Sequence, residues 1–391
     1  MNSRQRLLTA LQHKEPDRIP LDLASTQVTG ISVQAYKNLR SYLGLAPIQP
    51  VICDAIQQIC IPDDDILLKF GVDTRGLWPL TSHNCDFYDQ DDGEFLSHID
   101  EWGLGYRRHK KHGLWYDLYH SPLAGKPLSA EIIDNHPWPE GGDPKRIAGL
   151  RRQATAFRQA GYAVVLKSVC AGLLEMAIRI RGMEDFLVDL LIDEKNAGHL
   201  LDKILQVKLD YWQMALEQLA DVVDIIAEGD DFGTQSSQLI SLTTFRKTIK
   251  PRQQELISFM KKKAANAYIF FHSCGSIREF LPDFIEMGID IINPVHITAT
   301  GMEPKQLKKD FGADIVFWGG GIDTQNTLPH GTPQQVRDEV KRNIEALAPG
   351  GGFVFNTIHN IQADVPPENI VAMYEALQEY GIYGEPTDSG H

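Results

Sequence analysis

The second half of the chain alternates short apolar, β-branched runs with longer segments of helical pattern. This alternation is typical of βαβ units, which build parallel sheets. The clearest intervening helices are expected over 241–265, which opens with a Ser/Thr cluster, and over 332–347, which has a proline in its first turn. Six strands are predicted at residues 162–169, 222–228, 267–272, 290–293, 314–318 and 352–357.

Two further strands in the first half would close these units into a barrel. The candidates are residues 19–24 and 72–77. An open, doubly wound sheet fits the alternation too, but it normally carries a G-x-G-x-x-G turn after its first strand, and none stands there. The sequence therefore predicts an α/β protein, a (β/α)8 TIM barrel with an N-terminal extension.

Residues from about 84 to 141 interrupt this rhythm with aromatic residues, Gly, Pro and His in a polar background. Such a stretch is typical of a β-hairpin-rich insertion or a lid. No linker between independent domains is visible, so we expect residues 1–391 to form one barrel domain with this insertion.

The formal charge of −14 repels phosphate backbones and anionic lipids, and no basic run offsets it, so nucleic acid and membranes are not expected partners. The start of the chain reads as a polar amphipathic helix and no apolar run is long enough for a bilayer, which predicts a cytoplasmic protein. Five cysteines without a C-x-x-C pair are expected to be reduced. A homodimer is left open as an alternative to a monomer.

In a TIM barrel, catalytic groups lie at the carboxyl ends of the strands. The polar residues that end or follow the predicted strands are therefore the candidates for the site. They are Ser168, Cys170, Glu228, Asp230, Asp231, His272, Cys274, Asn293, His296, Asp323 and His359.

His272 and Cys274 stand two positions apart, and in extended backbone this spacing sends both side chains to one side. An imidazole and a thiolate suit zinc or another borderline-soft metal, whereas magnesium and calcium prefer oxygen ligands. His359 ends the last predicted strand and is the best candidate for a third ligand, although a strand-end histidine is often only structural.

The acidic segment 227–235 begins at the end of the second of the six runs. Because Glu228 and Asp230 continue the alternation of that strand, we expect both in the pocket as catalytic carboxylates, with Asp231 facing away. A solvated loop with an Asp helix cap is the structural alternative. Asp323, after a triple glycine, is a further candidate catalytic carboxylate, and Asn293, His296 and Gln235 are candidate substrate-binding residues.

Four segments together resemble the uroporphyrinogen decarboxylase superfamily, and more specifically its corrinoid-linked zinc methyltransferase branch. They are RLLTALQHKEPDRIPLDL, FFHSCGSIREFLPDFIEMGIDIINP, WGGGIDTQNTLPHGTPQQV and HNIQADVPPENIVAMYEAL. True decarboxylases of this superfamily carry an arginine-rich loop for a polycarboxylate substrate, where this chain reads LASTQVTG at residues 23–30. The missing arginines argue against decarboxylation.

The resemblance implies a zinc site at His272 and Cys274, where the methyltransferase branch adds a later cysteine and this chain has His359. Exchange of a thiolate for an imidazole makes the zinc more electrophilic, which suits a methyl donor such as a methyl ether, methanol or a methylamine. The chain lacks the D-x-H-x-x-G cobalamin-binding element, so the resemblance implies that a separate corrinoid protein carries the cobalamin.

Three alternatives remain open at this point. A thiol acceptor, methylated from the corrinoid, would reverse the transfer. A decarboxylase, lyase or isomerase on the same barrel would need no corrinoid and would use Glu228 or Asp230 as a base. A binding or regulatory protein would hold the metal without turnover.

Overall fold

Seven parallel strands form the central sheet of the structure, a computed structural model that describes residues 1–83 and 89–384. Along the sheet they follow the order β14-β13-β12-β11-β10-β9-β4. Their bounds are β4 Thr74–Leu77, β9 Ala163–Lys167, β10 Ile225–Gly229, β11 Tyr268–His272, β12 Ile291–Asn293, β13 Val316–Trp318 and β14 Phe353–Val354.

The segment around Leu21 joins the two edges of this sheet. On one side, Asp22 N–H donates to the Phe355 carbonyl and Phe355 N–H donates to the Pro20 carbonyl, directly after β14. On the other side, Asp73 N–H donates to the Leu21 carbonyl, directly before β4. The predicted barrel is confirmed, and residues 19–24 contribute a short bridge rather than a full strand.

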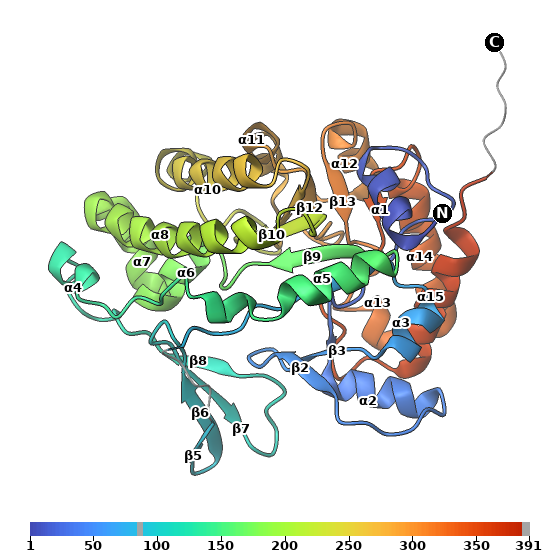
Figure 1. Cartoon of the computed structure of the whole chain (residues 1–391), viewed down its shortest axis with the longest axis horizontal. Coiled ribbons are helices and arrows are strands. Elements are labelled where there is room, and N and C mark those ends of the chain that lie inside the picture. The colour runs from blue at the N-terminus through green and yellow to red at the C-terminus, as the bar shows by residue number, and fades with distance from the viewer. Residues whose placement is uncertain (84–88, 385–391) are drawn as a thin grey trace.

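Helices cover the outside of the barrel (Figure 1). The two helices expected most clearly are present: α14 spans Pro333–Leu347, and residues 241–265 hold α9 Leu242–Thr244, a π-helical turn Phe245–Ile249 and α10 Lys250–Lys263. The other helices that follow strands of the barrel are α5 Leu150–Gln159, α6 Leu173–Arg181, α7 Met183–Ile192, α8 Glu194–Leu219, α11 Leu281–Met287, α12 Pro304–Phe311, α13 Thr327–His330 and α15 Pro367–Tyr380.

The barrel interior is filled by alternate residues of the strands. Val165 and Ile225 point inward, whereas Val164 and Ile226 pack toward the helices, as a two-residue period requires. Helix α1, Ser3–Leu11, adds Leu7 and Leu11 to the interior cluster. The barrel interior is thus apolar, and the polar candidate residues lie at the carboxyl ends of the strands.

The insertion contains a four-stranded antiparallel sheet that projects from the barrel (Figure 1). Its strands are β5 Gln90–Asp92, β6 Phe95–Ile99, β7 Gly105–His109 and β8 Asp117–His120. Residues 84–88 of the predicted insertion, with Cys85, lie outside the described residues. That residues 1–391 form a single domain stays a prediction.

A second small sheet was not expected from the sequence. It comprises β1 Ile31–Ser32, β2 Val51–Asp54 and β3 Ile59–Ile61. In the chain, helix α2 Val33–Tyr42 lies between β1 and β2, and helix α3 Asp64–Phe70 follows β3. Helix α4, Ala130–Asp134, follows the insertion sheet. Across residues 1–83 and 89–384, none of the helices combines the length and the apolar composition that a bilayer span needs.

Candidate metal centre

Three side chains converge at the carboxyl ends of the barrel strands: His272, Cys274 and His359. One potential ligand atom from each lies within 4.8 Å of the other two. Cys274 Sγ is 3.3 Å from His272 Nε2, and the rings of His272 and His359 are 5.6 Å apart between centroids. The structure thus brings together the three ligands expected from the sequence.

His272 ends β11 and is oriented by Asn293, which ends the neighbouring strand β12. His272 Nδ1 lies 2.6 Å from Asn293 Oδ1, and Asn293 Nδ2 donates to the Trp318 carbonyl. Because that second bond fixes the amide, its oxygen faces the imidazole and can only accept. Nδ1 must therefore carry the proton, which leaves the Nε2 lone pair free for a metal.

Cys274 is held by the turn that follows β11. Its backbone N–H donates to Asp231 Oδ1 over 2.7 Å, and the next N–H, from Gly275, donates to His296 Nδ1. Gly275 has φ +84°, and a Cβ there would lie 2.5 Å from backbone atoms of Gly233 and Thr234. Only glycine fits this turn, which returns the thiol toward His272.

His359 lies in the loop after β14. Its neighbour Asn360 fixes that loop, accepting from Gly30 N–H through Oδ1 and donating through Nδ2 to Gln27 and Gln57. Burial, followed by the proximity of His272 and His296, lowers the pKa of His359 to about 3. The imidazole is therefore neutral at physiological pH, the form that binds metals.

The donor set fits a zinc ion. Two imidazole nitrogens and one sulfur are ordinary zinc ligands, and tetrahedral geometry separates such atoms by roughly 3.3 to 3.7 Å. The 3.3 Å between Cys274 Sγ and His272 Nε2 already matches this spacing. Burial, together with Asp231 and Glu175, raises the pKa of the Cys274 thiol, so a cation is what would favour the thiolate.

The two predicted catalytic carboxylates of the acidic segment bond to groups other than the three candidate metal ligands. Glu228 accepts from Ser168 Oγ and Trp212 Nε1 and forms a buried ion pair with Lys208 at 2.8 Å. Asp230 accepts the N–H groups of Leu174 and Glu175 at the start of α6, which is the helix-cap alternative. Burial, followed by Glu175, raises the pKa of Asp230 to about 8.

Asp231, expected to face away, instead lies beside the ligands. Its Oδ1 is 3.7 Å from His272 Nε2 and accepts from Cys274 N–H. The alternation fails because β10 ends at Gly229, after which the chain turns. Burial and the nearby Glu175 raise the pKa of Asp231 to about 6.

Of the remaining predicted residues, His296 lies next to the cluster, whereas Asp323 and Gln235 bond within loops. His296 lies close enough to His359 to lower its pKa. Asp323, predicted as a catalytic carboxylate, accepts from Gln325 N–H and Asn326 Nδ2, which stabilises its own loop. Gln235 is exposed and donates to the Thr298 carbonyl.

Three site residues were missed at the sequence level: Glu175 and Arg179 on α6 and Tyr106 on β7 of the insertion. Arg179 Nη2 lies 3.1 Å from Glu175 Oε1, and its guanidinium lies near the Tyr106 side chain. Burial alone would lower the pKa of Arg179, but Glu175, Tyr106 and Asp231 raise it. The i, i+4 spacing of Glu175 and Arg179, directly after a barrel strand, is the signal that was available.

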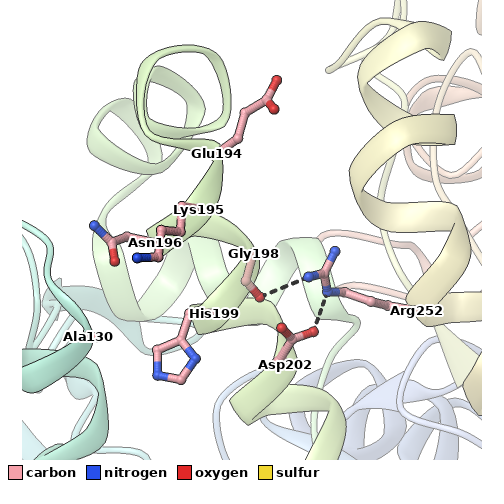
Figure 2. A pocket seen from close by; sticks show the side chains of 8 residues that line it. All are labelled: Ala130, Glu194, Lys195, Asn196, Gly198, His199, Asp202 and Arg252. Atoms are coloured by element: carbon pink, nitrogen blue, oxygen red, sulfur yellow. Dashed lines mark hydrogen bonds and ion pairs between the residues drawn. The ribbon is translucent and has the colours of Figure 1, made fainter.

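A surface pocket of about 370 Å³ lies elsewhere, between the start of α8 and Arg252 of α10 (Figure 2). Arg252 bonds there to Asp202 and to the Gly198 carbonyl. The pocket contains none of the predicted site residues, and its ion pair ties two helices together.

Comparison with known proteins assigns the family. The model of the family described as uroporphyrinogen decarboxylase (URO-D) matches residues 124–380, which is more than half of the chain. The chain belongs to this family. A uroporphyrinogen decarboxylase from Alkalilimnicola ehrlichii is 24% identical to this URO-D family chain over 96% of it and 93% of the relative. One from Chlorobium phaeobacteroides is 27% identical over 49% of this chain and 51% of its own length.

A solved structure described as a methyltransferase from Methanosarcina mazei shares the fold of this URO-D family member. It superposes with a TM-score of 0.62 over 97% of this chain and 99% of its own, at 18% sequence identity. At this identity the likeness establishes the barrel architecture and not the activity.

The hydrogen bond from His272 to Asn293 provides a direct test of the centre. Replacing Asn293 with alanine removes the acceptor that fixes the imidazole, and we expect the zinc affinity to fall by about 10- to 100-fold. Competition with a chromogenic chelator measures this. Asn343→Ala is the control, because Asn343 is also buried but bonds to the Gly321 carbonyl, away from His272. Equal zinc affinities of Asn293→Ala and the wild type would contradict the assignment.

Proposed function

We propose that this chain is a zinc-dependent methyltransferase. It would move a methyl group between a small methylated substrate, of the methyl ether, methanol or methylamine type, and cobalamin carried by a separate corrinoid protein. The observation that carries the proposal is the cluster of His272, Cys274 and His359, with Asn293 fixing the tautomer of His272. When bound, zinc would supply a Lewis acid for the departing oxygen or nitrogen.

The residues of the chain prepare the site for this chemistry. Asn293 holds His272 with its Nε2 lone pair available, and burial keeps His359 neutral. Asp231 holds the backbone of Cys274 so that the thiol stays next to His272. The site is therefore organised before any substrate arrives, which lowers the cost of reaching the reactive geometry.

The segment 23–30 argues against decarboxylation of a polycarboxylate. In place of an arginine-rich loop it forms a tight polar turn, in which Thr26 N–H donates to Thr29 Oγ1 and Thr29 is fully buried. No cationic side chain stands in this segment to pair with a carboxylate. The methyltransferase description of the Methanosarcina mazei protein, which has the same fold, is compatible with the proposal.

Glu228 and Asp230 take no part at the reacting atoms in this proposal. Their carboxylates are occupied by Lys208 and by the start of α6, so a lyase or isomerase that used either as a base would first have to break these contacts. This favours methyl transfer over the lyase alternative.

Methyl transfer to free cob(I)alamin tests the proposal. Zinc-loaded protein is mixed with cob(I)alamin and, in turn, methanol, an aryl methyl ether and a methylamine, while absorbance follows methylcobalamin formation. We expect one donor class to react. The rate of methylcobalamin formation should fall by more than about 100-fold in Cys274→Ala and stay unchanged in Cys53→Ala. Methylation of a thiol from methylcobalamin, with no donor reacting, would select the thiol-acceptor alternative. Turnover of a small substrate without cobalamin would contradict both.

A further inference from the structure

Asp231 places a carboxylate directly beside the candidate metal ligands without being one of them. Its Oδ1 lies 3.7 Å from His272 Nε2, the nitrogen that Asn293 leaves free for a metal. A zinc–nitrogen bond is about 2.1 Å long. An ion on Nε2 would therefore lie within about 6 Å of this carboxylate oxygen.

The Asp231 carboxylate is held in a fixed position beside the candidate ligands. Its side chain is 36% exposed, so its carboxylate is open to the site, and Oδ1 is held by Cys274 N–H. Arg179 is the nearby cation, but Glu175 already pairs with it at 3.1 Å. Asp231, Glu175 and Arg179 together thus carry one net negative charge next to the ligands.

This negative charge distinguishes between the substrates that the proposed function leaves open. With zinc bound to two neutral imidazoles and one thiolate, the addition of Asp231 makes the centre neutral overall. An anionic thiolate that joined the centre would face the Asp231 carboxylate at short range, whereas an ether, an alcohol or a methylammonium group would not be repelled.

We propose that Asp231 is a specificity-determining residue that excludes thiolate acceptors and thereby selects uncharged or cationic methyl donors. This inference rests on the proposed function, since it assumes a metal at His272, Cys274 and His359. It assigns to Asp231 both a hydrogen bond that positions Cys274 and a charge that rejects anions.

The experiment separates the charge of Asp231 from its hydrogen bond. Asp231→Asn keeps an oxygen that accepts from Cys274 N–H and removes the charge. Cobalt(II) replaces zinc as a spectroscopic probe, and 2-mercaptoethanol or imidazole is titrated into the protein at one pH while the absorption bands are followed. Asp338→Asn is the matched control, because Asp338 is exposed on α14 and accepts only from Gln334.

We expect Asp231→Asn to bind the thiolate on the order of tenfold more tightly than the wild type, with imidazole affinity unchanged and Asp338→Asn identical to the wild type. Equal thiolate affinity of Asp231→Asn and the wild type would overturn the inference while leaving the metal centre intact. An equal gain in affinity for thiolate and imidazole would also overturn the inference, because the substitution would then act by opening access to the metal and not through charge. Wild-type protein that binds no cobalt(II) would instead refute the proposed function.

Discussion

Replacing His359 with alanine is expected to lower the zinc affinity by more than about 100-fold and to abolish methyl transfer with it. His359 supplies one of three ligand atoms that lie within 4.8 Å of one another, and Asn360 fixes the loop that carries it. With only His272 and Cys274 left, a bound ion would have two protein ligands, too few for a stable zinc site.

Two variants control this experiment. His359→Cys puts back a ligand and is expected to recover zinc binding, because thiolate and imidazole are both ordinary zinc ligands. His330→Ala should behave like the wild type, because His330 is exposed at the end of α13. Chelator competition measures the zinc affinity of each variant. A wild-type zinc affinity in His359→Ala would show that His359 is not a zinc ligand.

Lys208→Met is expected to destabilise the protein by about 3 to 5 kcal/mol. The Lys208 ammonium and the Glu228 carboxylate are both buried and lie 2.8 Å apart. Burial alone would lower the pKa of Lys208, but the neighbouring Cys170 and Glu228 raise it, so the lysine is charged. Removal of the ammonium leaves the carboxylate buried without its counterion.

Urea denaturation compares Lys208→Met with Lys262→Met, an exposed lysine on α10 that should change stability by less than about 0.5 kcal/mol. The double variant Lys208→Met/Glu228→Leu should regain much of the loss, since no unpaired charge remains. An unchanged urea midpoint for Lys208→Met would show that the ion pair is not structural and would reopen a catalytic role for Glu228.

The sequence predicted the barrel because each strand and helix carries its own local signal. The alternation of apolar runs located β9 to β14, and the rule that catalytic groups follow barrel strands selected His272, Cys274 and His359. These predictions depend only on which residues end a strand. The small sheet of β1, β2 and β3 was missed because its strands are only two to four residues long, too short for a two-residue period to be recognised.

The surroundings of the candidate metal ligands could not be predicted in the same way. Asp231 depends on a turn after Gly229, where the two-residue period of a strand no longer applies. Tyr106 reaches Arg179 from the insertion, about 70 residues earlier in the chain, and no local pattern encodes that contact. Asn293 was expected to contact substrate, yet the structure shows its amide oxygen facing His272.

Zinc K-edge X-ray absorption of the zinc-loaded protein tests the central claim most directly. Coordination by Cys274, His272 and His359 predicts one sulfur at about 2.3 Å and at least two imidazole nitrogens at about 2.0 to 2.1 Å. In His359→Cys, which keeps three ligands, a second sulfur should replace one imidazole nitrogen. A wild-type spectrum with two sulfurs, or with oxygen ligands alone, would contradict the proposed centre.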